Sequence, residues 1–384
     1  FQLRKKFKVD VYTSFPNYNN IKYKRKLKDK VKHKGINIKY FKSYLRSGNN
    51  FFNIFFDYFI YVLTLLFKIN FYIKTKSNIC ITFATSPIFQ ALPAIYYSKI
   101  KKIPNIIWVQ DLWPEVLEDT GYIKNKYALR FVDKFVKFIY AKSDLIIAQS
   151  NSFKNHIKKK YKITNKIVTL HQPSEFKFQK KSSNKKNLFY VTYAGNFGSA
   201  QDFDTIINAF SSHNLHKNIR LNLIGTGKKM QYIKSQIKKK KLDTKILLTG
   251  YKSKKKLTQL LKNSSCFFIS LRNGKSLNKT IPGKFQTYIS FGKPLIICSF
   301  SDLNKFIIKN KLGYACKPNQ TEKLIKNLNK VHLLNETKIN KIYSSSKKVY
   351  ENFFEINKVT RQMEEYINLA EQNYAKKNIL QITK

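Results

Sequence analysis

Two glycine-containing segments in the second half of the chain have the composition of phosphate-binding loops. Residues 195–198, Gly-Asn-Phe-Gly, follow a strand-like run and precede a helix expected to begin near Gln201. Residues 225–227, Gly-Thr-Gly, hold the same place one strand and one helix later. Glycine lets backbone N–H groups come close to a phosphate at a helix N-terminus. The same pattern also fits a tight turn, so these loops alone leave both interpretations open.

A third segment of this half adds a cation. The sequence Pro-Gly-Lys at 282–284 opens an expected helix, which puts Lys284 in its first turn at the same edge of the sheet. A cation beside backbone donors suits a diphosphate. Residues 225–230 lack the third glycine of a GxGxxG fingerprint, and no GxxxxGK[ST] occurs. A hydride-transfer Rossmann enzyme and a P-loop NTPase are therefore disfavoured.

Two polar loops follow expected strands in the first half. Ser86 comes after the strand that ends at Ala84, and Asp-Leu-Trp-Pro-Glu at 111–115 comes after the strand 106–110. Ligands of open parallel sheets bind beyond the carboxyl ends of the strands. These two loops are therefore candidate binding segments.

The cysteines and histidines do not have the spacing of a metal site. The four cysteines lie singly in apolar contexts without a CxxC pair, so we expect reduced, buried thiols. The six histidines include no HExxH. We expect no metal ion and no bound cofactor.

Short apolar runs alternate with amphipathic stretches along the chain, a pattern typical of parallel sheets with crossover helices. The runs lie at residues 9–13, 36–41, 79–84, 106–110, 145–148, 167–170, 189–194, 220–224, 246–249, 267–271, 295–298 and 314–316. The sequence therefore predicts the α/β fold class.

A polar stretch divides these runs into two sets. We expect an N-terminal domain over 1–172, a solvated linker over 173–186 and a second domain over 187–336. Residues 337–384 lack strand patterns and are expected to form one or two C-terminal helices. Because the chain begins with Phe1 rather than Met, we expect that its natural start is missing.

The segment from Phe51 to Ile73 is almost wholly apolar, but its longest uninterrupted run, 58–67, has ten residues. A membrane-spanning helix needs about 20. One narrow stripe of a helical wheel holds the polar residues Asn53, Asp57, Tyr61, Thr64 and Lys68. The segment is either a helix buried between sheet and solvent or a helix lying in the interface of an anionic membrane; dense flanking lysines favour the membrane.

The chain is strongly basic, with 74 Lys+Arg against 21 Asp+Glu and a formal net charge of +53. Such a charge points to nucleic acid, anionic membranes or phosphorylated substrates. However, only seven of these residues are Arg, and Lys is over-used together with Asn, Ile, Phe and Tyr, as A/T-rich codons would produce. Both origins of the charge stay open.

Five motifs in this order resemble those of the nucleotide-sugar-dependent glycosyltransferases of family 4. They are Asp-Leu-Trp-Pro-Glu at 111–115, Ala-Gly-Asn-Phe-Gly-Ser-Ala-Gln at 194–201, Ile-Gly-Thr-Gly at 224–227, Thr-Gly-Tyr at 249–251, and Pro-Gly-Lys with Tyr288 and Gly-Lys-Pro-Leu-Ile at 282–296. The resemblance covers nearly the whole chain. It is strongest to the branch that builds O-antigen, capsular and colanic-acid-type polysaccharides, including transferases similar to the N-acetylfucosamine transferases.

The resemblance implies the GT-B architecture, with two facing Rossmann-like parallel-sheet domains, and a retaining sugar transfer from a nucleoside diphosphate, usually UDP, without a metal ion. The donor and its diphosphate would be bound by Gly195, Asn196, Phe197, Gly198, Gln201, Gly225, Gly227, Gly250, Tyr251, Pro282, Gly283, Lys284 and Tyr288. The acceptor side would contain Ser86, Asp111, Trp113 and Glu115.

The chain departs from the family pattern at several positions. Many members carry a Glu-x7-Glu pair where this chain has Lys279 and Thr287. The Arg and Lys that often follow the first strand of the second domain are matched by Asn196 and Gln201, so neutralisation of phosphate depends on Lys284 and backbone donors. The catalytic roles are therefore in doubt.

Two aspartates are the candidate catalytic carboxylates. Asp302 either orients a hydroxyl or caps the following helix. Asp111 either accepts a hydrogen bond from an acceptor hydroxyl or caps the turn after it.

We expect a peripheral membrane enzyme at the inner face of the plasma membrane that extends a polyprenyl-diphosphate-linked saccharide during surface polysaccharide synthesis. The segment from Phe51 to Ile73 and the positive field would hold it on an anionic membrane surface. The alternatives are an inactive GT-B protein that binds sugar nucleotides and a basic nucleic-acid-binding protein. Nucleic acid is not expected as a partner, because the lysines are spread over the chain and no known binding motif occurs.

Overall fold

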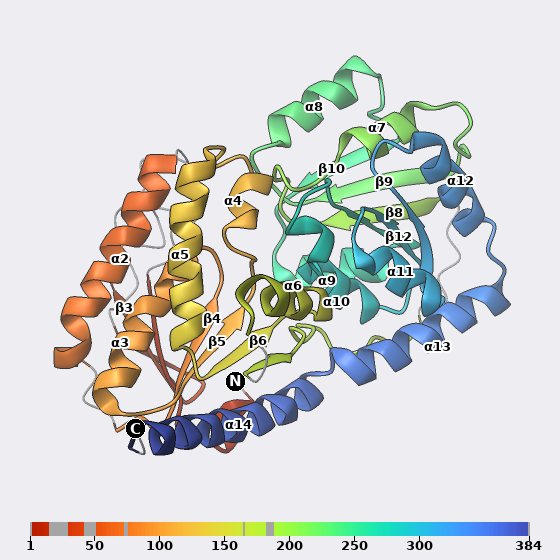
Figure 1. Cartoon of the computed structure of the whole chain (residues 1–384). Coiled ribbons are helices and arrows are strands. Elements are labelled where there is room, and N and C mark those ends of the chain that lie inside the picture. Colours follow the sequence, from red (N-terminus) through yellow and green to blue (C-terminus); the bar gives the residue numbers. More distant parts are fainter. Residues whose placement is uncertain are drawn as a thin grey trace. The chain divides into compact units, whose positions relative to one another are not determined.

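The computed structural model describes residues 2–14, 30–41, 51–72, 76–163, 166–181 and 188–382 (Figure 1). The chain forms two compact units. Unit 1 comprises Phe1–Leu170 and Val359–Lys384, and unit 2 comprises His171–Lys358. The alternation of strands and helices in both units confirms the predicted α/β fold class.

Unit 2 contains a six-stranded parallel sheet with the strand order β10-β9-β8-β11-β12-β13. The strands are β8 (Phe189–Ala194), β9 (Ile219–Ile224), β10 (Ile246–Gly250), β11 (Cys266–Ser270), β12 (Leu295–Cys298) and β13 (Gly313–Cys316). From β8 the chain adds β9 and β10 toward one edge of the sheet, and from β11 it adds β12 and β13 toward the other edge. The direction in which strands are added therefore reverses between β8 and β11. In sheets of this kind ligands bind at that switch point, beyond the carboxyl ends of the strands.

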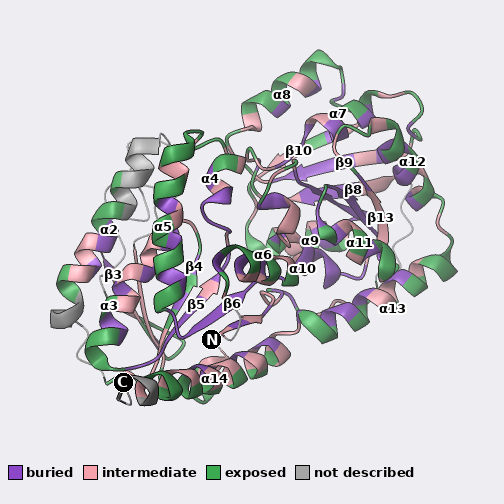
Figure 2. Ribbon diagram, viewed as in Figure 1, coloured by how far each residue is buried: buried purple, intermediate pink, exposed green. Residues whose placement is uncertain are grey.

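The crossovers of unit 2 are helical. They comprise α7 (Asp204–Ser211), α8 (Met230–Lys239), α9 (Lys254–Lys262), η3 (Leu277–Lys279), α10 (Gly283–Ile289) and α11 (Asp302–Lys309). Helices α12 (Thr321–His332) and α13 (Glu336–Phe353) follow the last strand. The strands carry continuous apolar runs because helices cover both faces of the sheet, and Figure 2 shows most of the strand residues buried.

Unit 1 contains a four-stranded parallel sheet, β4 (Cys80–Ala84), β5 (Asn105–Val109), β6 (Leu145–Ala148) and β7 (Ile167–Thr169), and a three-stranded sheet of β1 (Asp10–Ser14), β3 (Ile36–Phe41) and β2 (Lys30–His33). Its helices are η1 (Leu3–Lys5), α2 (Phe51–Tyr72), η2 (Ile88–Gln90), α3 (Ala91–Lys101), α4 (Glu115–Asp119), α5 (Lys126–Lys142), α6 (Asn151–Tyr161) and most of α14 (Ile356–Ile382).

Strand β2 is an element that the sequence did not predict. It pairs antiparallel with β3, and its sequence Lys-Val-Lys-His has one apolar residue. The other strands all lie within two residues of their predicted bounds.

Residues 173–181, which we expected in a solvated linker, are part of unit 2 and pack against its C-terminal helix. The amide of Ser174 donates to the carbonyl of Phe354 (2.9 Å), and the hydroxyl of Tyr350 donates to the carbonyl of Phe176 (3.2 Å). Phe176 is buried in the same cluster as Tyr350. Aromatic side chains among the lysines therefore anchor this segment; residues 182–187 lie outside the described part.

The predicted C-terminal helices are α13 and α14. From Val359 onward α14 packs on unit 1, where Met363, Ile367 and Ala370 are buried against Ile106 and Leu145 of the parallel sheet. Helix α14 therefore completes the core of unit 1.

Helix α2 buries Tyr61, Val62 and Leu65 and packs against η2 and α3. Tyr61, which we placed in the polar stripe, thus faces the protein, because its large ring packs beside Phe41 and only its hydroxyl is polar. The side chains of Asn53 and Asp57 lie outside the described part. Phe59 and Phe67 are exposed.

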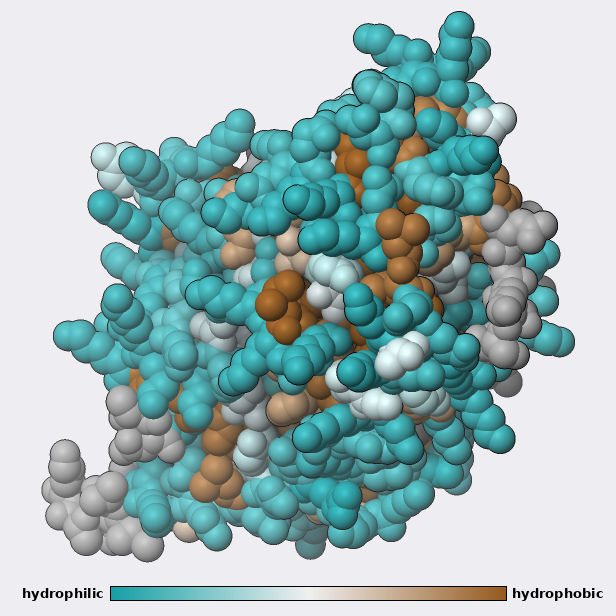
Figure 3. Space-filling view, turned by 90° about the vertical axis from the view of Figure 1, so that its right-hand side faces the viewer, coloured by the Kyte–Doolittle hydropathy of each residue, from teal (hydrophilic) through white to brown (hydrophobic). Residues whose placement is uncertain are grey.

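None of the helices in the described part has both the length and the apolar character needed to cross a bilayer. The face of the molecule drawn in Figure 3 is mostly hydrophilic, and its apolar residues lie in small separate groups.

Candidate functional site

Backbone hydrogen bonds join the glycine loops that follow β8, β9 and β10 at one edge of the unit 2 sheet. The amide of Gly195 donates to the carbonyl of Ile224 (2.9 Å), and that of Phe197 donates to the carbonyl of Thr226 (2.8 Å). The amide of Gly225 donates to the carbonyl of Gly250 (3.0 Å). The loops after β8, β9 and β10 thus form one surface beside the switch point.

Two of these glycines are required by close backbone approach. Gly225 has φ +138°, and a Cβ there would lie 1.9 Å from the carbonyl oxygen of Gly195. Gly227 has φ +154°, and its Cβ would lie 2.5 Å from the carbonyl oxygen of Phe197. Any side chain would separate the loops, because these contacts are with backbone and not with a flexible side chain.

Lys284 of α10 extends over Gly195. A Cβ on Gly195 would lie 2.7 Å from Cε of Lys284 and 3.2 Å from its Nζ. The ammonium group lies 4.8 Å from the centre of the Tyr193 ring. Within the part of the chain that the structure describes, no carboxylate or hydrogen-bond acceptor pairs with Lys284, and desolvation lowers its pKa to about 8. An unneutralised cation over a glycine loop is what an anionic ligand needs.

Three other predicted donor residues support this surface from within. Tyr288 is buried, stacks on Phe267 at 4.4 Å, and its hydroxyl accepts a hydrogen bond from the amide of Ala194 (2.6 Å). Phe197 is fully buried. The amide of Gly198 donates to Oε1 of Gln201 (2.9 Å), so Gln201 closes the loop.

The remaining predicted donor positions lie around the surface. Tyr251 follows Gly250 and is 79% exposed. Pro282 is buried and Gly283 is exposed at the start of α10. Asn196 projects beside Gly227 and Gly198. Asp302 is exposed in the first turn of α11, where Ser301 occupies the N-cap position.

In unit 1 the structure brings together three of the four predicted acceptor-side residues. The hydroxyl of Ser86 donates to Oδ2 of Asp111 (2.7 Å), and Nε1 of Trp113 donates to Oγ of Ser86 (3.2 Å). Desolvation raises the pKa of Asp111, and the hydrogen bonds from Ser86 oppose that rise. A half-buried carboxylate with a raised pKa is suited to accept a proton or a hydrogen bond from a substrate hydroxyl.

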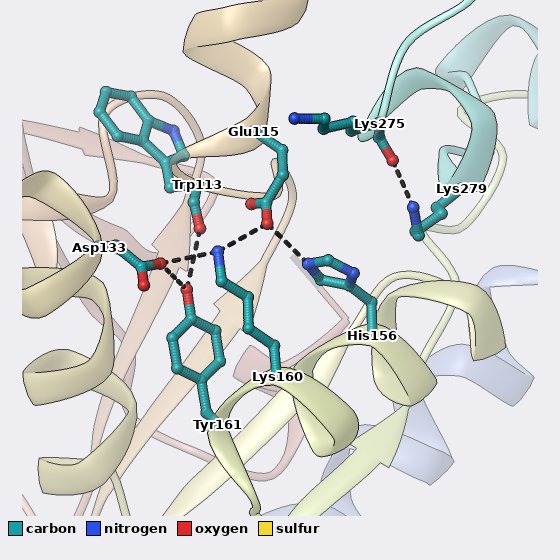
Figure 4. Close-up of polar contacts among 8 residues, drawn as sticks. All are labelled: Trp113, Glu115, Asp133, His156, Lys160, Tyr161, Lys275 and Lys279. Carbon is teal, nitrogen blue, oxygen red and sulfur yellow. Dashed lines mark hydrogen bonds and ion pairs between the residues drawn. The ribbon is translucent and has the colours of Figure 1, made fainter. Parts of the chain in front are cut away.

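Glu115, the fourth, belongs to a separate network (Figure 4). Its Oε1 lies 2.8 Å from Nε2 of His156 and 2.7 Å from Nζ of Lys160. Burial raises the pKa of Glu115, but these two partners outweigh it and bring the pKa to about 2. Lys160 also pairs with Asp133 (2.7 Å), which accepts from the hydroxyl of Tyr161 (2.6 Å). Glu115 is thus held inside unit 1 by an ion pair with Lys160 and a hydrogen bond with His156.

The sequence did not identify the other members of this network. His156 and Lys160 lie four residues apart on α6, and Asp133 comes from α5. Their i, i+4 spacing was the available signal, because it places both on one helix face.

In unit 2, Lys279 is one of the two positions at which many members of the family that the sequence resembles carry Glu. Its Nζ donates to the carbonyl of Lys275.

Residues 174–349 match the family model described as "Glycosyl transferases group 1". No curated protein sequence matches the chain significantly.

Solved structures with this fold are distant in sequence. Sucrose-phosphate synthase from Thermosynechococcus elongatus is 12% identical, with a TM-score of 0.71 over 95% of this chain and 89% of that one. A glycosyltransferase from Rickettsia africae is 17% identical, with a TM-score of 0.63 over 86% and 85%. Anabaena HepE, solved in complex with UDP, is 13% identical, with a TM-score of 0.61 over 86% of each chain.

A further match, to S. aureus TarM, covers 80% of this chain but 58% of that one, with 15% identity and a TM-score of 0.60, so the chain spans little more than half of that protein. At these identities the likenesses show the fold, which is the predicted GT-B fold.

Proposed function

We propose that this chain is a glycosyltransferase that moves a sugar from a nucleoside diphosphate, preferably UDP, to a polyprenyl-diphosphate-linked saccharide. The match of residues 174–349 to the model "Glycosyl transferases group 1" and the GT-B fold support this proposal. The proposal includes retention of anomeric configuration, no metal ion, a place in surface polysaccharide synthesis, and a position at the inner face of an anionic membrane.

The observation that carries the proposal is Lys284. Its ammonium lies over Gly195 at the switch point of the unit 2 sheet, and in the described part no acid neutralises it. A diphosphate there would accept hydrogen bonds from the ammonium, and from those loop amides that are not already bonded within the loops, and would restore the charge balance. UDP in the structure of Anabaena HepE supports UDP as the donor nucleotide.

Asp111 is the candidate acceptor-side carboxylate. Ser86 holds the carboxylate by a hydrogen bond, and Trp113 holds Ser86, so Asp111 could orient an acceptor hydroxyl for attack at the anomeric carbon. The leaving diphosphate, stabilised by Lys284, would itself help to accept the proton. Glu115 would keep the shape of the loop 111–115 through its pairs with α6.

The test is turnover with UDP-sugars and a short polyprenyl-diphosphate saccharide, with the product configuration read from NMR anomeric couplings. A product that keeps the donor configuration is the expected result. An inverted product would refute retention. UDP binding without turnover by any sugar would favour the inactive binder, in keeping with Lys279 and Thr287 in place of the glutamates.

A further inference from the structure

Helix α5 exposes an aromatic face. Its buried side consists of Val132, Val136, Ile139 and Tyr140. On another side Tyr127, Phe131 and Phe138 are 79%, 63% and 46% exposed, and Phe135 is 37% exposed. At 100° per residue these four rings lie within about 80° of one another around the helix. A helix on a soluble protein normally carries polar side chains there.

Cations border this aromatic face. Arg130, Lys134 and Lys137 are exposed on α5, and Nζ of Lys142 lies 5.9 Å from the centre of the Phe138 ring. The one acid of the helix, Asp133, is already paired with Lys160 and Tyr161. The outer surface of α5 is therefore aromatic and positively charged.

A row of ring contacts leads from this face to the loop 111–115. Phe131 contacts Phe135 (5.0 Å between ring centres), Phe135 contacts Phe89 of η2 (5.8 Å), and Phe89 contacts Trp113 (5.6 Å). Trp113 in turn shares Ser86 with Asp111. All of these residues belong to unit 1, so the exposed rings of α5 pack, through the partly buried Phe89 and the buried Trp113, against the candidate acceptor side.

We propose that α5 lies on an anionic lipid surface through Tyr127, Phe131 and Phe138, and that this docking brings the candidate acceptor side at Asp111 close to a lipid-linked acceptor. Aromatic side chains bordered by lysine and arginine suit the headgroup region of such a membrane. The inference rests on the lipid-linked acceptor of the proposed function. Single-stranded nucleic acid also binds rings and cations, but it uses a groove, whereas these rings lie on the outer side of one helix.

The experiment measures flotation of the protein with phosphatidylcholine vesicles that contain or lack phosphatidylglycerol. The test variant is Phe131→Asp/Phe138→Asp, and the matched control is Ile308→Asp/Leu333→Asp, which changes exposed apolar residues of unit 2. We expect wild type and control to float with the anionic vesicles and the α5 variant to lose at least about tenfold in partitioning. Lys134→Glu/Lys137→Glu should act in the same direction, and more strongly at low salt.

Two readouts separate this inference from the proposed function. UDP binding by the α5 variant should equal that of wild type, which also shows that it folds. Turnover of a lipid-linked acceptor should fall in the α5 variant, whereas turnover of a water-soluble short-chain acceptor should not. Unchanged flotation of the α5 variant would overturn the inference, as would release of the protein from vesicles by single-stranded RNA at physiological salt. If the wild-type protein does not bind UDP, the result would instead count against the proposed function.

Discussion

At the scale of single residues, Lys284 makes donor binding dependent on pH. Desolvation lowers its pKa to about 8 in the free protein, and a bound diphosphate would raise that pKa. UDP affinity should therefore be constant below pH 8 and fall by up to about tenfold per pH unit above it. Calorimetric titrations across pH 7 to 10 measure this. Lys284→Arg, which keeps the charge, is the control and should bind with little pH dependence; an equal fall in both proteins would exclude Lys284 as the cause.

Asp111 should act on turnover and not on donor binding. Asp111→Asn keeps the size of the side chain but removes the charge that would accept from the acceptor hydroxyl. We expect kcat to fall by about a hundredfold or more with UDP affinity unchanged. Steady-state kinetics with UDP titration measure both quantities. If Asp111→Asn has the kcat of wild type, Asp111 only caps the turn that follows it.

Glu115 should act on stability instead. Its pKa is lowered to about 2 from an ordinary value of 4.5, so its contacts with Lys160 and His156 stabilise the fold above pH 4.5 and this contribution is lost as the pH falls toward 2. Glu115→Gln should lower the free energy of unfolding at pH 7 by about 3 kcal/mol. Its stability should then change less than that of wild type between pH 5 and pH 3 in urea unfolding. If the free energy of unfolding of Glu115→Gln falls between pH 5 and pH 3 as much as that of wild type, this role of Glu115 is contradicted.

At the scale of elements, α14 is predicted to hold unit 1 together. Ile367 is 4% exposed and packs in the cluster that contains Leu145 and Ile147. Ile367→Ala should destabilise unit 1 by about 2–5 kcal/mol, because it leaves a cavity against the sheet. Urea unfolding measures the loss, and Glu371→Ala, an exposed position on the same helix, is the control. Equal stability of the two variants would refute the packing role.

The strands and loops were predictable because their patterns are local. Buried parallel strands require apolar runs, such as 145–148 and 295–298, and the glycine loops follow directly from such runs. The charged strand β2 carries no such pattern, and its pairing with β3 is a tertiary effect. The buried side of α2 was misassigned at Tyr61 because its partner Phe41 comes from a strand that the wheel does not contain.

The candidate site was predictable to the same extent. Lys284 and the glycine loops were found because each follows a strand of one sheet. The supporting role of Tyr288 and the network of Glu115 with His156, Lys160 and Asp133 were not, since these contacts join elements distant in the sequence. Sequence patterns thus located the surfaces, whereas side-chain packing decides which residues can reach a ligand.

At the scale of the whole molecule, we predict that turnover needs no metal ion. In the described part no group of three or more His, Cys, Asp or Glu residues could hold one. Stabilisation of the leaving diphosphate would come from Lys284 and backbone amides. We expect turnover to be unchanged within about twofold after EDTA treatment, and to gain nothing from added Mg²⁺ or Mn²⁺. Loss of activity in EDTA that returns with Mg²⁺ would contradict this expectation.

The central claim is a nucleoside-diphosphate site at Lys284 in unit 2. Its most direct test is calorimetric titration of the protein with UDP, GDP and ADP, with Lys284→Ala and Lys284→Arg in parallel. The account predicts that UDP binds, that Lys284→Ala weakens it by about tenfold to a hundredfold, and that Lys284→Arg retains most of the affinity. Absence of binding by all three nucleotides, or equal UDP affinity in wild type and Lys284→Ala, would contradict it.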